Sequence, residues 1–514
     1  MPVAPARAQD PATERNGFER NGLPSLGDSS SEDFSVGTER KIGDEILREI
    51  RVDPDYIDDP ILLEYLQSIW QPLVAQARAR GNISADIDQR FAWEPFLVRD
   101  PSVNAFALPG GYVGVHLGLI AMTATRDELA SVLAHEMSHV TQRHIARSIG
   151  NSKRQSLLSI AGLILGILAA SRSGSADGAQ AAIAGSQALA VQGQLNFSRD
   201  MEREADRVGF AVMSGAGFAP GGMAAMFEKL DQNSRLNDSG GFPYLRSHPL
   251  TSERIGEARA RLGTAPPVAP VSVLEHTAAQ ARARVLMDTR VDALRRWQAL
   301  DTERNLATAV PDKLLGAYES ALASTLLRDW ARADASIAYA LGIVRGNPRS
   351  DARAERAVAL LNVQSLLARG DTAKAASALQ PYLAKNMNKD ASRPVTLFEA
   401  QIALTGPADD AVMRQEASDL QTWVALYPND SMAWTLLSQL WQRQSQPLRA
   451  IRADAESRYA LGDLSGAVER LRAGQRRARE SSTVDFIDAS VIDSRLRDVE
   501  AQRRAIAADE KAGR

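Results

Sequence analysis

Residues 133–144 read LAHEMSHVTQRH, which places His135 and His139 four positions apart with Glu136 directly after the first. Just upstream, residues 125–128 (TRDE) have the form of a helix capping box, and apolar residues then recur at helical spacing. Residues four apart lie on one face of a helix, so both imidazoles can bind the same ion. The stretch therefore predicts a helix that carries two ligands of a metal site.

Zinc suits this pattern because it binds imidazole nitrogen and, with three protein ligands, keeps a fourth position for water. In this arrangement Glu136 is expected to act as the general base for attack on a peptide carbonyl. The chain has no cysteine, which excludes disulfides, thiolate zinc sites and cysteine nucleophiles. We therefore expect one zinc ion per chain, bound by His, Asp or Glu, and a hydrolytic reaction.

The third ligand has two known solutions. In one, a glycine and a histidine follow the second motif histidine by three and six residues, but this chain has glutamine and isoleucine there. In the other, a glutamate comes from a later helix. The segment FSRDMEREADRVGF at 197–210 offers Glu202 and Asp206 on one helical face, with Glu204 turned away.

Glu202 is accordingly the predicted third ligand. Asp206 is predicted to accept the free ring N–H of a ligating histidine, which would fix the tautomer and orientation of that ring. Charged helices are usually solvated faces, which is the alternative interpretation of this segment. The apolar residues that follow at 208–212 favour burial of one side instead.

The other histidines of the motif region and the linker are not predicted to be metal ligands. His144 falls between the positions that a third ligand requires and is predicted to face solvent or to pack between helices. His116 continues a strand pattern and is predicted to be structural. His276 receives no assignment.

Length and composition predict several domains of globular type. A chain of 514 residues is too long for one hydrophobic core. Because 60 Lys+Arg nearly balance 63 Asp+Glu, the net charge does not favour nucleic acid as a partner. Residues 1–35 are rich in Pro, Gly and Ser and are expected to be a disordered leader, in which residues 6–8 resemble the cleavage site of a truncated signal peptide. Residues 36–262 mix strand-like and helical patterns and predict an α+β domain that is mostly helical with a small sheet.

Three prolines at 263–273 predict a Pro-rich linker over 263–285. Residues 286–480 have the pattern of short amphipathic helices joined by glycine turns, similar to tetratricopeptide repeats. Gly370 and Gly406 lie 36 residues apart, near the period of about 34 in that repeat, although Gly462 is out of register. A non-repeating helical bundle is the alternative. Residues 481–514 are expected to form a charged helix or a frayed tail.

LLSIAGLILGILAA at 157–170 has no charged residue. It is too short to span a bilayer, which requires about 20 residues. A buried helix is the favoured interpretation. The alternative is a mobile flap that covers the active site or contacts a membrane surface.

HEMSH at 135–139 and EREAD at 202–206 together resemble the zinc metallopeptidase family of the CAAX prenyl endopeptidases and the heat-shock protease HtpX. NAFALPGGYVGVHLGLI at 104–120 and SHPLTSERI at 247–255 agree with the same family. The resemblance implies a zincin-type fold and a gluzincin endopeptidase. It implies that His135, His139 and Glu202 are zinc ligands. Glu136 would be the general base, and Asp206 would be a supporting acceptor behind a ligand.

The resemblance also implies roles for two other segments. It places the strand from Asn104 to Val115 beside the cleft, where its edge pairs with an extended substrate and Gly110 and Gly111 permit close backbone approach. It places His248 near the metal. There His248 would act as a gate that closes the site, as a stabiliser of the transition state, a role that Arg254 could also fill, or as a turn cap.

The repeat-like helices and the lack of clear spanning helices resemble the periplasmic members of the family. This implies hydrolysis of misfolded or stalled envelope proteins, with unfolded outer-membrane proteins as substrates. It also implies a protein partner at the repeats, such as the outer-membrane assembly machinery. The alternative is a non-proteolytic chaperone or adaptor with a vestigial or usually closed metal site, but the intact Glu136 and ligands favour the enzyme.

Overall fold

The computed structural model describes residues 35–149, 199–236, 243–263, 273–300, 309–348, 351–383, 392–407, 409–480 and 486–512. The expected leader before Ser35, the apolar stretch at 157–170 and the prolines of the expected linker lie outside these residues. Within the described residues, no helix combines the length and the apolar character needed to cross a membrane.

The amino-terminal part is mostly helical with a small sheet, which confirms this part of the predicted fold class. Its elements are, in chain order, α1 (Val36–Arg51), β1 (Tyr56–Ile57), α2 (Pro60–Ala79), α3 (Ala85–Arg90), β2 (Glu94–Val98), β3 (Ala105–Leu108), β4 (Tyr112–His116), α4 (Leu117–Met122), α5 (Arg126–Thr141), α6 (His144–Ile149), α9 (Arg199–Gly215), α10 (Gly221–Leu236), α11 (Pro243–Ser247) and α12 (Ser252–Arg261).

The four strands form one mixed sheet in the order β1-β2-β4-β3. The parallel pair is β2 with β4, while β1 and β3 pair antiparallel at the two edges. All five residues of β4 are buried, as expected for a central strand that is covered on both faces. The predicted strand at 105–108 is therefore an edge strand, with its outer side free of any other described strand.

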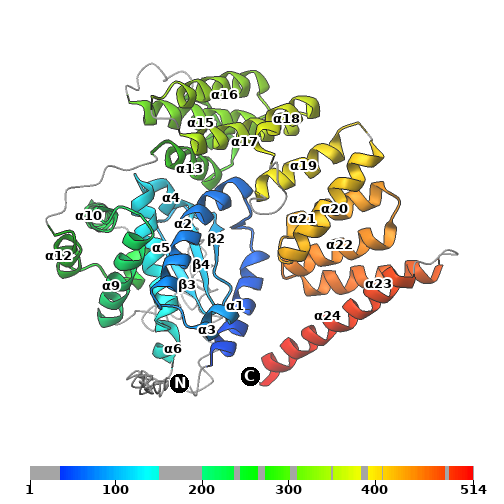
Figure 1. Ribbon diagram of the computed structural model, residues 1–514, viewed down its shortest axis with the longest axis horizontal. Coiled ribbons are helices and arrows are strands. Elements are labelled where there is room, and N and C mark those ends of the chain that lie inside the picture. The colour runs from blue at the N-terminus through cyan, green and yellow to red at the C-terminus, as the bar shows by residue number, and fades with distance from the viewer. Residues whose placement is uncertain are drawn as a thin grey trace, which may run out of the picture.

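The motif helix α5 begins where the capping pattern predicted. The Thr125 side chain accepts a hydrogen bond from the Glu128 amide at 3.1 Å, and the Glu128 carboxylate accepts one from Ala124 at 2.7 Å. From Glu128 to Thr141 every residue of α5 is buried. The helix packs against α2, α9 and α10, which enclose it beside the sheet (Figure 1). Its polar side chains are therefore held among buried partners.

The remainder of the described chain is entirely helical. It contains α13 (Val273–Met287), α14 (Val291–Ala299), α15 (Val310–Leu326), α16 (Trp330–Arg345), α17 (Ala352–Ala368), α18 (Thr372–Leu379), the 3₁₀ turn η2 (Gln380–Tyr382), α19 (Arg393–Thr405), α20 (Asp410–Leu426), α21 (Ser431–Arg443), α22 (Pro447–Ala460), α23 (Leu464–Glu480) and α24 (Phe486–Ala512). We call these helices the helical array. The tetratricopeptide character of the array stays a prediction.

Helices that follow one another in the array pack side by side, as in α15 with α16 and α21 with α22. Gly370 and Gly462 end α17 and α22 in the left-handed region, with φ of +81° and +86°, as expected for glycine after a helix. In Figure 1 the array begins above the sheet and continues down its right side to α24. The expected tail thus contains a helix, with Ile492, Leu496 and Val499 buried.

The expected linker differs from the structure in its second half. Helix α13 begins at Val273, and its residues Leu274, Ala278 and Ala281 are buried, with the helix packed on α4 and α15. One hydrophobic core runs from Trp70 on α2 through α5 and α13 to the first helices of the array. The proline-rich sequence marks a break in the pattern, but both sides of it share a core.

Ion pairs also fasten the array to the amino-terminal end of α2. Arg282 on α13 binds both oxygens of Asp59 at 2.6 Å, and both side chains are almost fully buried. Arg393, the first residue of α19, binds both oxygens of Asp58 at 2.6 and 2.7 Å. The same guanidinium contacts Asp430, the residue that caps α21. The array is therefore held to α2 at two successive aspartates.

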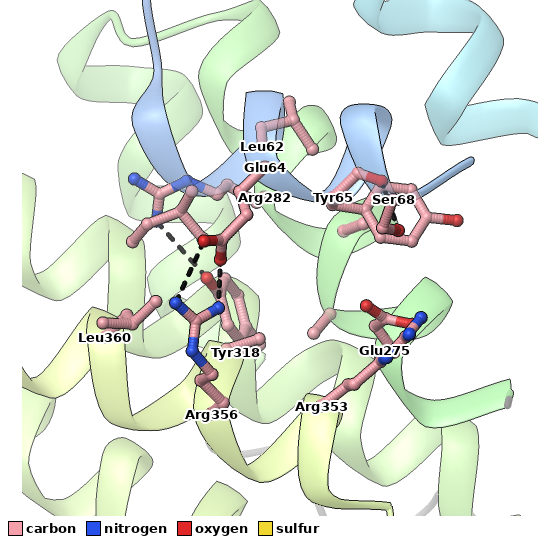
Figure 2. A pocket seen from close by; sticks show the side chains of 14 residues that line it. Leu62, Glu64, Tyr65, Ser68, Glu275, Arg282, Tyr318, Arg353, Arg356 and Leu360 are labelled. Carbon is pink, nitrogen blue, oxygen red and sulfur yellow. Dashed lines mark hydrogen bonds and ion pairs between the residues drawn. The ribbon is translucent and has the colours of Figure 1, made fainter. Parts of the chain in front are cut away.

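A third pair lies nearby, where α2 faces α13 and α17 across a cavity of about 200 Å³. Figure 2 shows Arg356 on α17 bound to Glu64 on α2, with Glu275 and Arg353 on the opposite side of the cavity. Apolar side chains, among them Leu62, Ala278 and Leu360, also line the cavity. The cavity thus lies between α2 of the amino-terminal part and the first helices of the helical array, with one ion pair on each of two sides.

Candidate metal centre

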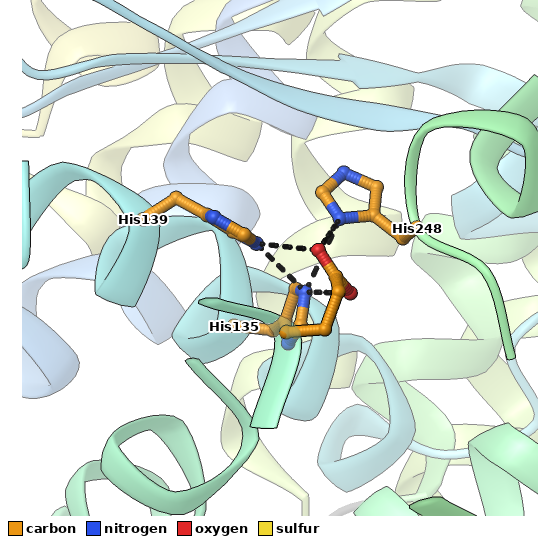
Figure 3. Close-up of side chains that lie close together, drawn as sticks. His135, His139 and His248 are labelled. Atoms are coloured by element: carbon orange, nitrogen blue, oxygen red, sulfur yellow. Dashed lines mark hydrogen bonds and ion pairs between the residues drawn. The ribbon is translucent and has the colours of Figure 1, made fainter. Parts of the chain in front are cut away.

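The structure brings together the three predicted metal ligands. On α5, His135 Nε2 and His139 Nε2 lie 3.0 Å apart. Glu202 on α9 lies 3.4 Å from each of these two histidines, which Figure 3 labels, through Oε2 to His135 and through Oε1 to His139. All three side chains are buried. A nitrogen or oxygen atom from each of them and from His248 fits within a span of 4.8 Å.

Close packing of α9 on α5 sets this geometry. A side-chain carbon at Gly209 would lie 3.0 Å from the Ala134 carbonyl oxygen and 3.1 Å from the His135 amide. Gly209 follows Glu202 by seven residues, hence on the same face of α9. Its missing side chain lets the two helices approach so that Glu202 reaches the motif histidines. The role of this glycine was not predicted from the sequence, although its spacing of seven residues from Glu202 was a usable signal.

Asp206 lies beneath His135, as predicted, with Oδ1 2.9 Å from His135 Nδ1. Arg254 on α12 donates to both Asp206 oxygens at 2.7 and 2.8 Å and contacts Glu202 Oε2 at 2.8 Å. Burial alone would raise the pKa of Asp206, but hydrogen bonds from Arg254 and His135 outweigh it and lower the pKa to about 2. Arg254 thus binds the carboxylates of Asp206 and Glu202, while its alternative role as a donor to the transition state stays a prediction.

Glu136 joins the motif helix to the edge strand. Its Oε2 accepts a hydrogen bond from the Ala107 amide of β3 at 3.1 Å, and its Oε1 lies 3.5 Å from His248 Nε2. The side chain is fully buried, and burial raises the pKa of this carboxyl group. A carboxyl group with a raised pKa, fixed beside the ligands, is suited to take up and return a proton.

His248 immediately follows α11 and enters the cluster of ligands. Its Nδ1 lies 3.0 Å from Glu202 Oε1 and 3.3 Å from His135 Nε2, and its ring stacks on Tyr244 with centroids 4.7 Å apart. The predicted proximity to the metal ligands is therefore present. The predicted loop position also fits, because Pro249 follows and α12 starts only at Ser252.

His144 is buried and packs between helices rather than facing solvent. Its Nδ1 lies 2.9 Å from His139 Nδ1, and its Nε2 lies 3.1 Å from Glu204 Oε2. Burial lowers the pKa of His144 to about 4, so the ring is neutral at pH 7. Glu204 points away from the ligands, as predicted from its helical angle, but toward this histidine.

The remaining histidines lie in structural positions. His116, which ends β4, has Nδ1 3.0 Å from Ser102 Oγ, in keeping with its predicted structural role. His276 is buried between Tyr65 and the Thr123 carbonyl oxygen, with ring nitrogens 2.5 and 2.8 Å from those oxygen atoms. Both nitrogens of His276 therefore have partners within the core.

The predicted substrate segment divides into two parts. Asn104 precedes β3, and its carbonyl accepts from the His116 amide at 3.1 Å, which closes the β3–β4 hairpin. Gly110 and Gly111 form the opposite turn, with φ of +79° and +89°. A side-chain carbon at Gly110 would lie 2.9 Å from Arg40 Cα. Gly110 thus permits close approach to α1, and Gly111 permits close approach to residues 91–93, while β3 itself faces the site.

Comparison with known proteins agrees with this geometry. Residues 64–262 match the model described as peptidase family M48. These residues form an M48 peptidase domain. The match confirms the metallopeptidase resemblance, and it contains the motif helix α5 as well as Glu202, Asp206 and His248.

Three relatives are similar to this chain over different shares of its length. The chain is 35% identical to the beta-barrel assembly-enhancing protease of Escherichia coli over 54% of this chain and 53% of the relative. It is 29% identical to the protein of that name from Yersinia pestis over 90% and 91%. It is 31% identical to the mitochondrial metalloendopeptidase OMA1 of Saccharomyces cerevisiae over 37% and 53%. The first and third alignments thus span about half the length of the relative, whereas the second includes the helical array.

Proposed function

We propose that this chain is a zinc-dependent endopeptidase of the gluzincin type, with one zinc ion held by His135, His139 and Glu202. The observation that carries the proposal is the spacing of three buried ligand atoms. Tetrahedral ligands at 2.0–2.1 Å from zinc would lie about 3.3 Å from one another. The separations here are 3.0, 3.4 and 3.4 Å, so the residues fit the ion.

Zinc bound there would supply a Lewis acid that acidifies a water molecule and polarises the peptide carbonyl. The protein's own residues supply the rest. Glu136 takes the proton from the water and returns it to the leaving amine, at a position fixed by the Ala107 amide. Asp206 and Arg254 hold His135 and Glu202 in place, which preserves the geometry during the reaction.

The edge strand β3 is proposed as the substrate strand. An extended peptide can add to an exposed sheet edge through main-chain hydrogen bonds. Because Ala107 on β3 already contacts Glu136, a peptide paired with this edge would pass directly beside the general base. The position of β3 at the end of the sheet supports this assignment.

We further propose that the clients are misfolded or stalled envelope proteins, including unfolded outer-membrane proteins, and that the chain works in the periplasm. The support is the name of the relatives, which assigns them to beta-barrel assembly, and the alignment over 90% of this chain. The helical array would bind a protein partner such as the assembly machinery, because stacked helices offer an extended surface.

A second candidate function is a chaperone or adaptor whose metal site is usually closed. It is favoured by one observation, the presence of His248 within 3.3 Å of two of the proposed ligands. A site with its ligands intact but occupied by this side chain would bind clients without cutting them.

The deciding experiment compares the wild-type protein with Glu136→Gln. Both should contain one zinc ion per chain, since Glu136 is not a proposed ligand. Cleavage of an unfolded outer-membrane protein should fall by about 10²- to 10⁴-fold in the variant, because an amide cannot accept the proton. Glu202→Ala is the metal control and should lose zinc. Near wild-type turnover by Glu136→Gln, or a wild-type protein free of zinc after loading, would contradict the proposal.

A further inference from the structure

The second proposed ligand, His139, has an unusual partner behind its ring. A metal-binding histidine generally donates its other ring N–H to a carboxylate, a backbone carbonyl or water. Here the atom opposite His139 Nδ1 is the Nδ1 of another histidine, His144, at 2.9 Å. The far nitrogen of His144 then meets Glu204 Oε2 at 3.1 Å. Two rings and a carboxylate thus form one line that starts at the metal centre.

The backbone after α5 is shaped to return His144 to this position. Helix α5 ends at Thr141, and Arg143 adopts the left-handed region with φ of +52°. Such a conformation is uncommon for a residue with a side chain and requires support from its surroundings. The support is Glu39 on α1, which is buried and accepts from Arg143 Nε at 2.6 Å. The turn brings His144 back against the helix that carries His139.

The direction of the hydrogen bonds follows from the chemistry of each partner. A neutral imidazole has one donor and one acceptor nitrogen. If His139 binds zinc through Nε2, its hydrogen is on Nδ1, and His144 Nδ1 must be the acceptor. The hydrogen of His144 is then on Nε2, where it faces Glu204. An ionised carboxylate only accepts, so Glu204 selects the tautomer of His144 that His139 requires.

The two ligand histidines are therefore braced in parallel ways. His135 faces Asp206 directly, and Asp206 is held by Arg254. His139 faces His144 and then a carboxylate that Arg147 binds at 2.8 Å. Both lines end in an arginine–carboxylate pair. They differ in depth, because the first pair is buried and the second is partly exposed.

We propose that His144 is a positioning residue of the metal centre, which accepts the Nδ1–H of His139 and is itself held in the correct tautomer by Glu204. This inference rests on the proposed zinc site. It assigns a function to two side chains that bind neither the ion nor a substrate. Their effect acts through His139, so it should appear first in the affinity for zinc.

The test measures zinc affinity of the full-length protein by competition with a chromophoric chelator. His144→Ala should weaken binding by about 10- to 100-fold, the usual range for loss of such a partner. His144→Asn should recover most of the affinity, because its side-chain oxygen can occupy the place of Nδ1 and accept the same hydrogen. Glu204→Ala should weaken binding less, by about 3- to 10-fold, because water can replace a partly exposed acceptor.

Arg203→Ala is the matched control. Arg203 precedes Glu204 on α9 and forms exposed ion pairs with Asp200 and Glu253, so its loss should leave zinc affinity unchanged. Melting temperatures measured in chelator show which variants still fold without metal. If His144→Ala does not fold, Glu204→Ala carries the test, since its side chain is partly exposed. Nitrogen-15 spectra of the histidine rings should show that the hydrogen of His144 is on Nε2 in the wild-type protein. In Glu204→Ala this tautomer should no longer be favoured.

The inference is overturned if folded His144→Ala binds zinc within about threefold of wild type, or if His144→Asn binds no better than His144→Ala. If Glu204→Ala folds but His144→Ala does not, the inference is overturned when Glu204→Ala shows both an unchanged zinc affinity and an unchanged spectrum of the histidine rings. A wild-type protein that binds no zinc would instead refute the proposed function, and the inference with it. The wild-type measurement therefore separates the two failures.

Discussion

Replacing His248 with alanine is expected to speed hydrolysis of a short unstructured peptide by about 10- to 100-fold. The imidazole is buried, and its Nδ1 lies 3.0 Å from Glu202 Oε1 and 3.3 Å from His135 Nε2. A catalytic zinc ion with three protein ligands keeps one position open. A fourth side chain in the cluster would fill that position, so we predict that His248 closes the site.

The magnitude follows from the contacts that hold His248 in place. A hydrogen bond to a charged group contributes about 1.5–3 kcal/mol. That free energy corresponds to a closed population that exceeds the open one by about 10- to 150-fold, and a minor open state lowers the apparent activity by the same factor. Removing the imidazole leaves the site open in every molecule. The ring also stacks on Tyr244, and this contact stabilises the closed state further.

The assay is kcat/KM on a fluorogenic peptide with zinc in slight excess. The double variant with Glu136→Gln is the control and should be inactive, which assigns the added activity to this site. A loss of about 10²-fold or more in His248→Ala would show a transition-state stabiliser instead of a gate. Unchanged activity on both a peptide and an unfolded protein would refute the two functional interpretations together and leave a structural role.

Two further predictions concern stability of the helical array. Arg393→Ala should lower the free energy of unfolding by about 2–4 kcal/mol, because it leaves the largely buried carboxylates of Asp58 and Asp430 without their arginine partner, whereas the exposed Arg290→Ala should leave it essentially unchanged; equal effects in urea denaturation would contradict this. Burial, together with the nearby Glu399 and Asp419, raises the pKa of Glu416 from 4.5 to about 7, so the protein loses stability as the pH rises from about 4.5 to 7. Glu416→Gln should therefore stabilise the protein at pH 8 by about 1 kcal/mol after screening, and not at pH 4; an unchanged pH profile would exclude this effect.

The parts of the metal centre that the sequence predicted are those set by helical periodicity. His135 and His139 on one helix, and Glu202 and Asp206 on another, share a face because residues four apart always do. The same rule turned Glu204 away from the ligands. Periodicity is a local property, so it needed no knowledge of how the two helices pack.

The parts that the sequence did not predict depend on contacts between distant segments. His144 lies beyond the end of α5, and its position depends on the left-handed turn at Arg143 and on Glu39, more than 100 residues away. The sequence predicts Arg254 only as an alternative donor to the transition state, whereas its carboxylate partners Asp206 and Glu202 lie on α9. No helical spacing contains this information, because it arises only when the helices pack.

The shared core decides how the role of the helical array can be tested. Composition marks a boundary near residue 263, yet Tyr318 and Leu361 belong to the same core as Leu133 of the motif helix. Deleting the array would expose that core and leave Asp59 without Arg282, at a cost comparable to the whole stability of a domain. Loss of peptide hydrolysis in such a deletion would then report unfolding. Substitutions of exposed array side chains avoid this, since they leave the core and the ion pairs of α2 intact. A variant of this kind that cuts a short peptide normally but no longer processes an unfolded outer-membrane protein would assign the array to client binding.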